Sequence, residues 1–260
     1  MDCQKEINIL VENLGNYLIE NNLKYQVLGV SGGLDSTFVA YLCHEVFLNY
    51  QIPVHLMALP SSTNSREEKT AAILTQRAFA NTSVAIDIDN SYSILSTTAL
   101  INGKDDDISR GNIKARIRMI YLMDAASKLG GTVIGTDNKS EHELGFYTIF
   151  GDMGMVEPIV SLYKTEVYEL AEYVRMRYKK MLTEQLNPRI KNCIDALTAA
   201  INNVPSDGNG VGTDETQIGA KYSIIDKVLK GEMIEDEELY NKILDRVHKN
   251  EFKKYIPVYL

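Results

Sequence analysis

A glycine-rich turn between a strand and a helix constrains this chain more than any other feature. The turn has the sequence Gly29-Val30-Ser31-Gly32-Gly33-Leu34-Asp35-Ser36. The apolar run 25–30 before it predicts a buried strand, and residues 37–49 after it predict a helix. Because glycine lacks a Cβ, the backbone can turn sharply here and bring N–H groups close to a ligand. We therefore expect a ligand-binding loop directly after the first strand of the fold.

The first part of this turn, Gly29–Gly33, fits the G-x-S-x-G pattern of a serine-hydrolase nucleophile elbow. That chemistry needs an acid and a histidine downstream, and His142 and His248 are available. However, the hydrolase fold places its elbow after several strands, whereas this turn follows the first strand. The hydrolase interpretation also leaves Asp35 and Ser36 without a function.

A phosphate-binding loop uses every residue of the turn. Gly32 and Gly33 let backbone amides approach a phosphate, and the next helix directs its N-terminal dipole at the same anion. The hydroxyls of Ser31 and Ser36 can donate to phosphate oxygens, and Asp35 can ligate a Mg²⁺ ion that bridges the phosphates. The turn lacks the Gly-Lys-Ser/Thr of a Walker A loop and is not G-x-G-x-x-G. We therefore interpret Ser31 as a donor to phosphate and not as a nucleophile.

Strands and helices alternate along the first half of the chain. We expect further strands at 53–59, 83–88 and 132–136, and helices at 3–21, 65–79, 91–101 and 108–129. This alternation predicts an α/β fold with a mostly parallel sheet flanked by helices. The second half reads as helical at 164–178, 180–201, 219–230 and 235–249. We expect these helices to form a C-terminal extension.

Charge and composition exclude several classes of protein. The formal net charge of -8 argues against a nucleic-acid-binding protein, which needs a basic surface. No apolar run approaches the ~20 residues that span a bilayer, and residues 1–6 lack the plan of a signal peptide. Cys3, Cys43 and Cys193 show no C-x-x-C spacing, so neither disulfides nor a zinc site is expected. These observations favour a cytoplasmic protein without membrane association.

The segment Ser31-Gly32-Gly33-Leu34-Asp35-Ser36 resembles the S-G-G-x-D-S pyrophosphate loop of the N-type ATP pyrophosphatases. Within that superfamily, later segments resemble the ammonia-dependent NAD synthetases in the order in which that family has them. They are RGNIKARIRM (110–119), GTDNKSEHELGFYTIFGD (135–152), PIVSLYKTEVYELAEY (158–173), DETQIGAKYSIID (214–226) and the pair His248-Lys249.

The resemblance implies an adenine-nucleotide alpha-hydrolase-like fold in a single domain, 1–260. Its core would cover about 22–177 and its helical C-terminal part about 178–260, with no glutaminase domain. The implied activity is adenylation of the nicotinate carboxylate of deamido-NAD by ATP, followed by amidation with ammonia to give NAD and AMP. The implied partners are ATP, deamido-NAD, ammonia, Mg²⁺ and a second copy of the chain, with the site at the dimer interface. Ammonia would come in free form or from a separate glutaminase.

The resemblance also assigns roles to individual residues. Asp35 and Glu141 would bind Mg²⁺, and Asp35 and Lys164 would be catalytic. Arg116, His248 and Lys249 would contact deamido-NAD. The residues that would contact ATP are Gly29, Val30, Ser31, Gly32, Gly33, Leu34, Asp35, Ser36, Thr136, Lys164 and Ser206.

Simpler interpretations exist for three of these residues. Arg116 and Lys164 could be solvated surface charges. Glu141 could sit in the first turn of a helix, where the dipole favours an acid.

The match departs from the family pattern at several places. Ile149 stands where the family has a lysine that contacts deamido-NAD, and the stretch 151–157 is one residue shorter. Residues 178–201 look like an inserted helix, and the loop 205–214 is either a surface linker or a mobile loop over a ligand. These departures keep open a related adenylating ligase with a different carboxylate substrate. A nucleotide-binding protein without catalysis is a third interpretation, which intact Asp35, Glu141 and Lys164 disfavour.

Overall fold

The structure is a computed structural model, and it describes residues 1–98, 107–184, 187–205 and 212–255 of the chain. The strands are β1 (Gln26–Gly29), β2 (Val54–Ala58), β3 (Thr82–Ala85) and β4 (Thr132–Ile134). The helices are α1 (Cys3–Glu20), α2 (Leu34–Tyr50), α3 (Arg66–Phe79), α4 (Asp89–Thr98), α5 (Asp107–Leu129), α6 (Lys139–Leu144), α7 (Lys164–Glu184), α8 (Pro188–Asn202), α9 (Asp214–Ile218), α10 (Tyr222–Leu229), α11 (Glu237–Asn250) and the 3-10 helix η1 (Glu251–Lys254).

The four strands form one parallel sheet in the order β3-β2-β1-β4. In its register, Gln26 of β1 pairs with Val54 of β2 on one side and with Thr132 of β4 on the other. The chain winds from β1 outward to β3 and then crosses back to place β4 on the opposite side of β1. The strand order therefore reverses between β1 and β4, and open α/β sheets bind ligands outside the carboxyl ends of strands at such a point. The α/β class with a parallel sheet is confirmed.

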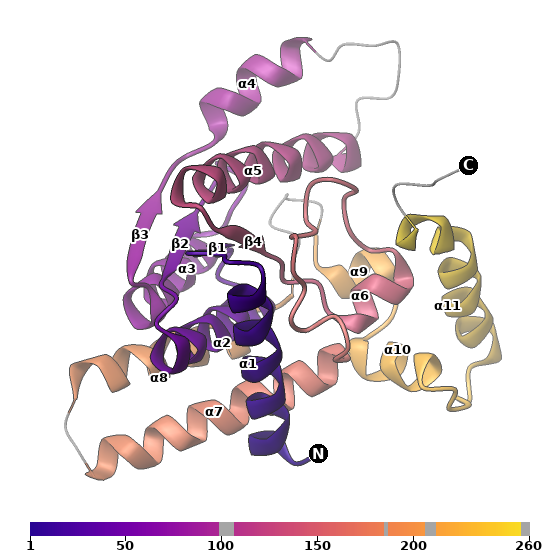
Figure 1. The fold of residues 1–260 in the computed structure, drawn as a ribbon. Helices are drawn as coiled ribbons and strands as arrows, with labels where there is room; N and C mark the ends of the chain where they lie inside the picture. The colour runs from indigo at the N-terminus through magenta and orange to yellow at the C-terminus, as the bar shows by residue number, and fades with distance from the viewer. Residues whose placement is uncertain (99–106, 185–186, 206–211, 256–260) are drawn as a thin grey trace.

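Neighbouring side chains of β1 enter two different apolar clusters because successive side chains of a strand point to opposite faces. Leu28 packs into a cluster with α1, α2, α3, α7 and α8, whereas Val27 packs into a cluster with α5. Both side chains are fully buried. Figure 1 shows the corresponding layers, with α4 and α5 on one side of the sheet and α1, α2, α7 and α8 on the other.

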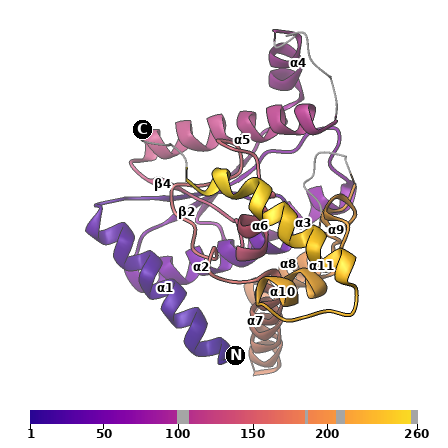
Figure 2. The same cartoon turned by 90° about the vertical axis from the view of Figure 1, so that its right-hand side faces the viewer.

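The C-terminal helices form a third apolar cluster, which includes Leu144, Tyr222 and Ile225. Figures 1 and 2 show α6, α9, α10 and α11 grouped beside the sheet. Helix α8 belongs to the main cluster instead, through Ile190, Cys193 and neighbouring residues. The single-domain assignment and its division at about 177/178 remain predictions.

Two helix boundaries in the second half differ from the sequence expectation. Helix α7 continues to Glu184, six residues beyond the expected end. Helix α8 begins at Pro188 with Asn187 as its N-cap, and proline is favoured in the first helical turn because its missing N–H needs no partner there. The alternative that Glu141 sits in the first turn of a helix is confirmed, because α6 begins at Lys139. The short helix α9 was not foreseen, since five residues carry too little periodicity to recognise.

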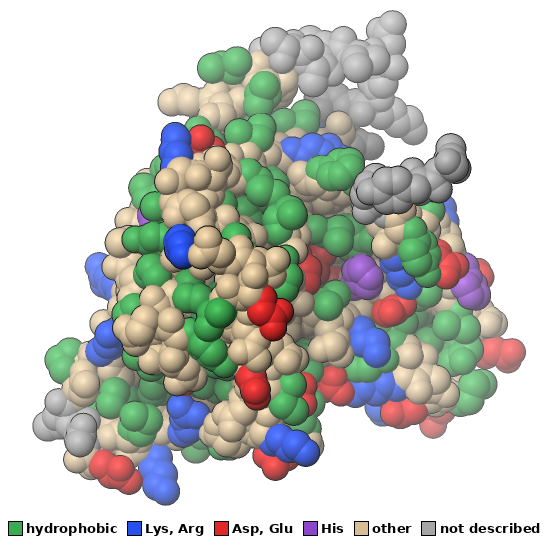
Figure 3. Space-filling model, viewed as in Figure 1, with side chains coloured by type: hydrophobic (Ala, Val, Ile, Leu, Met, Phe, Trp, Pro, Cys, Tyr) green, Lys and Arg blue, Asp and Glu red, His purple; other side chains and the backbone are tan. Residues whose placement is uncertain are grey.

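Charged side chains of both signs are interspersed over the face drawn in Figure 3, most visibly around α10 and α11 at the right. Among the described helices, none is long and apolar enough to cross a membrane.

Candidate active site

A cavity of about 860 Å³ opens at the carboxyl ends of β1 and β4. The turn after β1 and the residues Gly135 to Asp137 after β4 line it from the sheet side. Helices α6 and α7 contribute Glu141 and Lys164, and the C-terminal helix α11 contributes Arg246. The cavity therefore lies where the strand order reverses, which is the position expected for a ligand in this kind of sheet.

The turn after β1 presents the open N-terminus of α2 to the cavity. Gly33 is the N-cap of α2, and no side chain of the described residues caps it. The Ser31 hydroxyl lies 3.1 Å from the Ser36 hydroxyl and accepts the Gly33 N–H at 3.2 Å. Uncapped amides at the start of a 17-residue helix, with two hydroxyls beside them, suit an anion such as a phosphate.

Gly32 is required by the shape of this turn. Its φ is +87°, in the left-handed region, and a Cβ added there would lie 2.2 Å from the backbone oxygen of Glu68. The Gly32 carbonyl accepts a hydrogen bond from Asn203 of the α8 C-cap at 3.2 Å. The turn is thus held between α3 and the end of α8.

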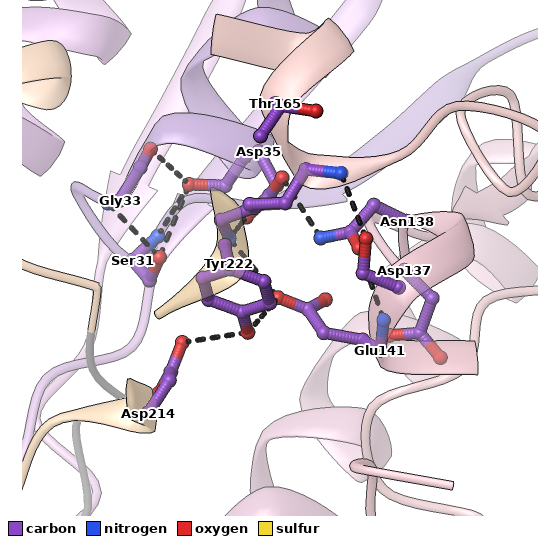
Figure 4. A network of polar contacts seen from close by, with 12 residues as sticks. Ser31, Gly33, Asp35, Asp137, Asn138, Glu141, Thr165, Asp214 and Tyr222 are labelled. Atoms are coloured by element: carbon purple, nitrogen blue, oxygen red, sulfur yellow. Dashed lines mark hydrogen bonds and ion pairs between the residues drawn. The ribbon is translucent and has the colours of Figure 1, made fainter. Parts of the chain in front are cut away.

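Two carboxylates converge on one lysine in the wall of the cavity. Lys164 Nζ donates to Asp35 Oδ2 and to Glu141 Oε1, the latter at 3.0 Å. The three side chains come from three different helices, α2, α6 and α7 (Figure 4). Lys164 is only 3% exposed, so the pair of ionic contacts is largely shielded from water.

The burial of this centre shifts its ionisation. Burial alone would lower the pKa of Lys164, but the charges of Asp35 and Glu141 raise it well above its ordinary value. Burial raises the pKa of Glu141, while the ammonium group of Lys164 counteracts the shift. The lysine therefore stays protonated and holds the two carboxylates together.

Tyr222 of α10 extends the network toward Asp214 of α9. Its hydroxyl donates to Glu141 Oε1 at 3.2 Å and lies 3.4 Å from Asp214 Oδ2 (Figure 4). Lys164 Nζ lies 5.1 Å from the centroid of the Tyr222 ring, within reach of a cation–π interaction. Burial and the neighbouring carboxylates raise the pKa of Tyr222, so its hydroxyl remains a donor.

Asp226 connects the two helices that carry Glu141 and Lys164. It accepts the Ser140 hydroxyl of α6 and the Thr165 N–H of α7, at 2.5 and 2.9 Å. The same Ser140 oxygen accepts the Lys164 N–H at 2.9 Å. All of these groups are buried or nearly so, and Asp226 itself is 2% exposed. The buried carboxylate thus fixes the start of α7 against α6.

A second acidic group lies beside the centre. Asp137 is 5% exposed, and its Oδ2 is buried without a hydrogen-bond partner in the described part of the chain. Burial and the charge of Glu157 raise the pKa of Asp137. Burial likewise raises the pKa of Glu157 to about 7, although that carboxylate accepts the Gly154 and Asp137 N–H groups. Both carboxyl groups therefore keep their protons to a higher pH than exposed acids do.

Comparison with known proteins assigns this chain to a family. The sequence model described as NAD synthase matches residues 6–257. The chain is 35% identical over 277 residues to an NH(3)-dependent NAD(+) synthetase of Helicobacter pylori strain HPAG1, covering 98% of this chain and 95% of the relative. The chain belongs to the NAD synthase family.

Solved structures of similar proteins agree with the family assignment. An NMN synthetase from Francisella tularensis superposes with a TM-score of 0.84 at 26% identity, covering 100% of this chain and 99% of the other. An NH3-dependent NAD synthetase from Campylobacter jejuni gives a TM-score of 0.72 at 27% identity, with both chains covered completely. The resemblance proposed from the sequence is therefore confirmed at the level of the NAD synthase family.

Most residues predicted to contact ATP lie at the cavity. Its lining includes Gly29, Val30, Ser31, Gly33, Leu34, Asp35, Ser36, Thr136 and Lys164, together with the predicted metal ligand Glu141. Gly32 shapes the turn without lining the cavity. Ser206 lies outside the described residues. Their roles toward ATP remain predictions.

The residues predicted to contact deamido-NAD lie elsewhere on the chain. Arg116, His248 and Lys249 are exposed and do not line the cavity formed by the described residues. Arg116 Nε donates to the Ile149 carbonyl at 3.2 Å. Their role across a dimer interface remains a prediction.

Sequence reasoning missed several residues of the site. Asp214, Tyr222 and Asp226 all fall in the matched segment DETQIGAKYSIID, so the segment was noticed but its side chains were given no role. Tyr222 and Asp226 are four residues apart and therefore share one face of α10, which a helical projection could have revealed. No comparable signal pointed to Arg246 and Lys253, which line the cavity from the C-terminal end of the chain.

Proposed function

We propose that this member of the NAD synthase family uses ATP and ammonia to convert deamido-NAD into NAD. The observation that carries the proposal is the convergence of Asp35, Glu141 and Lys164 beside the open N-terminus of α2. A helix N-terminus and a buried lysine suit a polyphosphate, and two carboxylates suit its counterion. The curated relative named above is an NH(3)-dependent NAD(+) synthetase that matches this chain over nearly its whole length.

The chemistry requires charge neutralisation more than acid–base groups. The nicotinate carboxylate attacks the α-phosphorus of ATP, forming an acyl-adenylate and releasing pyrophosphate. Ammonia then attacks the acyl carbon, the bond to the phosphate oxygen breaks, and AMP leaves with the electron pair. In this proposal Ser31, Ser36 and the amides of α2 hold the leaving pyrophosphate, and Lys164 neutralises charge that develops on the phosphates.

Magnesium fits the donor set at the centre of the site. Asp35 and Glu141 both direct an oxygen at the same point, which Lys164 Nζ occupies in this structure. Mg²⁺ is usually held by one or two carboxylates together with substrate phosphates. When bound, it would neutralise negative charge on the phosphates. Asp35 and Glu141 would hold it, and Lys164 would then turn toward the nucleotide.

A homodimer is also part of the proposal. Ile108, Ile120 and Met123 are exposed hydrophobic residues on one face of α5, and Arg116 lies on the same face. A second copy packed there would cover this apolar face and bring Arg116 close to the partner's site. Sedimentation of the wild type and of Ile120→Asp tests this, because a charge in the interface should release monomers.

Ammonia would be supplied in free form or by a separate glutaminase.

The three cysteines are free, which supports a reducing, cytoplasmic setting.

One assay tests the proposed activity. The protein is incubated with ATP, Mg²⁺, ammonium and deamido-NAD, and NAD and AMP are quantified. We expect equal amounts of both products. Asp35→Asn should abolish product formation, whereas Asp124→Asn, an exposed acid on α5, should not. Absence of NAD in the wild-type reaction would overturn the assigned activity, and an Asp35→Asn variant that keeps wild-type activity would overturn the assignment of the loop.

Amidation of nicotinate mononucleotide is a second candidate. The Francisella tularensis NMN synthetase superposes with a TM-score of 0.84, against 0.72 for the Campylobacter jejuni NAD synthetase. In addition, Ile149 replaces a lysine that the NAD synthetase pattern uses for its second substrate. Replacing deamido-NAD by nicotinate mononucleotide in the same assay decides between the two, because the better substrate gives the higher kcat/KM.

A further inference from the structure

Two basic side chains line the cavity without an assigned role. Arg246 comes from α11 and Lys253 from η1, and both face the segment that follows α6. The Arg246 guanidinium lies 5.3 Å from the centroid of the Phe146 ring, and its Nη1 donates to the Gln217 carbonyl at 3.4 Å. Its Nε is buried and has no hydrogen-bond partner among the described residues.

The two cations lack a carboxylate partner. Lys253 Nζ donates to the carbonyls of Gly145 and Tyr147 at 2.7 and 3.0 Å. No carboxylate of the described residues lies within 4.0 Å of either cation. Burial lowers the pKa of both side chains. The charge of Arg246 lowers the pKa of Lys253 further, and the charge of Asp152 offsets part of this shift. Two positive charges close together in the partly buried wall of the cavity repel each other. This is unfavourable unless an anion binds beside them.

We propose that Arg246, supported by the charge of Lys253, binds a phosphate of the pyridine nucleotide that this enzyme amidates. The free Nε and the planar guanidinium fork suit a phosphate, which accepts two parallel hydrogen bonds from arginine. The inference rests on the proposed function and adds a recognition site for its second substrate.

The position of Arg246 separates it from the ATP phosphates. Figures 1 and 2 show α6 between α2, whose N-terminus faces the turn, and α11, which carries Arg246. Arg246 instead stacks on Phe146, three residues before Ile149. The chain thus lacks a lysine at 149 but offers a guanidinium that lines the cavity beside Phe146, in the segment that leads to Ile149.

The experiment compares Arg246→Ala with Lys242→Ala. Lys242 is an exposed lysine of the same helix, so its removal changes the charge equally without touching the cavity. For Arg246→Ala we expect the KM of the pyridine nucleotide to rise about 10- to 100-fold, the usual effect of losing charge-assisted hydrogen bonds. The KM of ATP should change less than about 3-fold. Arg246→Lys should lie between wild type and alanine, because it keeps the charge but loses the fork.

A binding measurement by calorimetry, with the pyridine nucleotide and without ATP, makes the test independent of turnover. Deamido-NAD and nicotinate mononucleotide are titrated separately into wild type and each variant. If Arg246→Ala binds both nucleotides more weakly, Arg246 contacts the phosphate nearest the nicotinate ribose, which both nucleotides carry. If the variant binds only deamido-NAD more weakly, Arg246 contacts the second phosphate. Equal binding by wild type and Arg246→Ala, or a KM increase for ATP alone, would overturn the proposal. If Arg246→Ala does not fold, Arg246→Lys carries the same test.

If the wild type binds either nucleotide but amidates neither, the proposed function fails while the Arg246 site is still tested.

Discussion

The ammonium group of Lys164 lies 3.0 Å from Glu141 Oε1 inside the protein, and the same ammonium group also contacts Asp35. One buried lysine and two largely buried carboxylates therefore share one position. Removing the cation leaves two carboxylates that repel each other, and breaking such a buried arrangement typically costs about 3–5 kcal/mol. We expect Lys164→Met to lower the free energy of unfolding by that amount in urea titrations without nucleotide.

A matched surface pair provides the control for Lys164. Lys230 pairs with Glu166 at 2.8 Å, but its side chain is 35% exposed. Lys230→Met should cost less than about 1 kcal/mol because water screens the pair. Adding Glu141→Gln to Lys164→Met should restore part of the lost stability. Equal effects of Lys164→Met and Lys230→Met would show that burial does not strengthen the central arrangement.

The sheet could be predicted from the sequence because its strands are short apolar runs, and glycine and polar residues separate them from the helices. All four expected strands are present and parallel. The same reasoning could not separate α7 from α8 correctly, since residues 180–187 continue the helical pattern and only Pro188 marks the new start. It offered α6 only as an alternative for Glu141, because this helix is six residues long and is defined by its caps, Asn138 and Gly145, rather than by periodicity.

The site was predictable where neighbouring residues share one function and less so where distant segments meet. The turn 29–36 could be interpreted alone because its glycines and hydroxyls act together. The alternative of a solvated surface charge is wrong for Lys164, which is 3% exposed, but without the family resemblance its sequence context could not have revealed this. Arg246 reaches the cavity only through the packing of α11 against α6, which no local pattern encodes.

Asp226→Asn should impair the reaction as well as stability. Asp226 holds Ser140 and the Thr165 N–H, so it determines how Glu141 and Lys164 face each other. An asparagine keeps the size but loses the charge-assisted hydrogen bonds, worth about 1.5–3 kcal/mol in a buried site. We expect kcat/KM for ATP to fall at least about 10-fold. Steady-state kinetics at saturating second substrate measure it.

Asp236→Asn is the control for Asp226→Asn. Asp236 caps α11 through the Leu239 N–H at 2.9 Å and is exposed. Its replacement should cost less than about 1 kcal/mol in stability, because asparagine is also a good N-cap, and leave the KM of ATP unchanged. If both variants lose activity in proportion to their stability, Asp226 has no positioning role.

Stability should fall as the pH rises through the pKa of Glu157. Its pKa is about 7 in the folded protein against an ordinary value of 4.5, chiefly because of burial, so the folded state binds more protons than the unfolded state. Its contribution is complete below pH 4.5 and is lost as pH rises through 7. His44 acts in the opposite direction, because its lowered pKa of about 4 makes stability rise with pH up to about 6.5. Above pH 6.5 the contribution of His44 is constant, so the loss of stability from pH 6.5 to 8 reports Glu157 together with Asp137, whose pKa is also raised by burial and by the charge of Glu157.

Urea titrations should show a loss of roughly 1 kcal/mol between pH 6.5 and 8. Asp137→Asn removes the neighbouring like charge and should reduce this loss, with greater stability at pH 8. Glu232→Gln, at an exposed position far from the pair, should keep the wild-type pH dependence. A wild-type stability that stays constant over this range would contradict the raised pKa of Glu157.

The two glycines of the phosphate turn should differ sharply in their tolerance of alanine. At Gly32 the φ of +87° disfavours any side chain, and a Cβ would meet the Glu68 carbonyl oxygen at 2.2 Å, which is backbone and cannot move away cheaply. At Gly33 the φ is -80°, and the nearest atom to an added Cβ is the Ser31 hydroxyl at 3.3 Å. We expect Gly32→Ala to lose about 2 kcal/mol or more of stability and to abolish ATP binding. Gly33→Ala should stay within about 1 kcal/mol of wild type, with ATP bound at most several-fold more weakly because the methyl group crowds the Ser31 hydroxyl. Thermal unfolding measures the stability of both variants, and calorimetric titration measures their binding of ATP. Comparable losses of stability and ATP binding in the two variants would show that the strained backbone at Gly32 does not determine the shape of the turn.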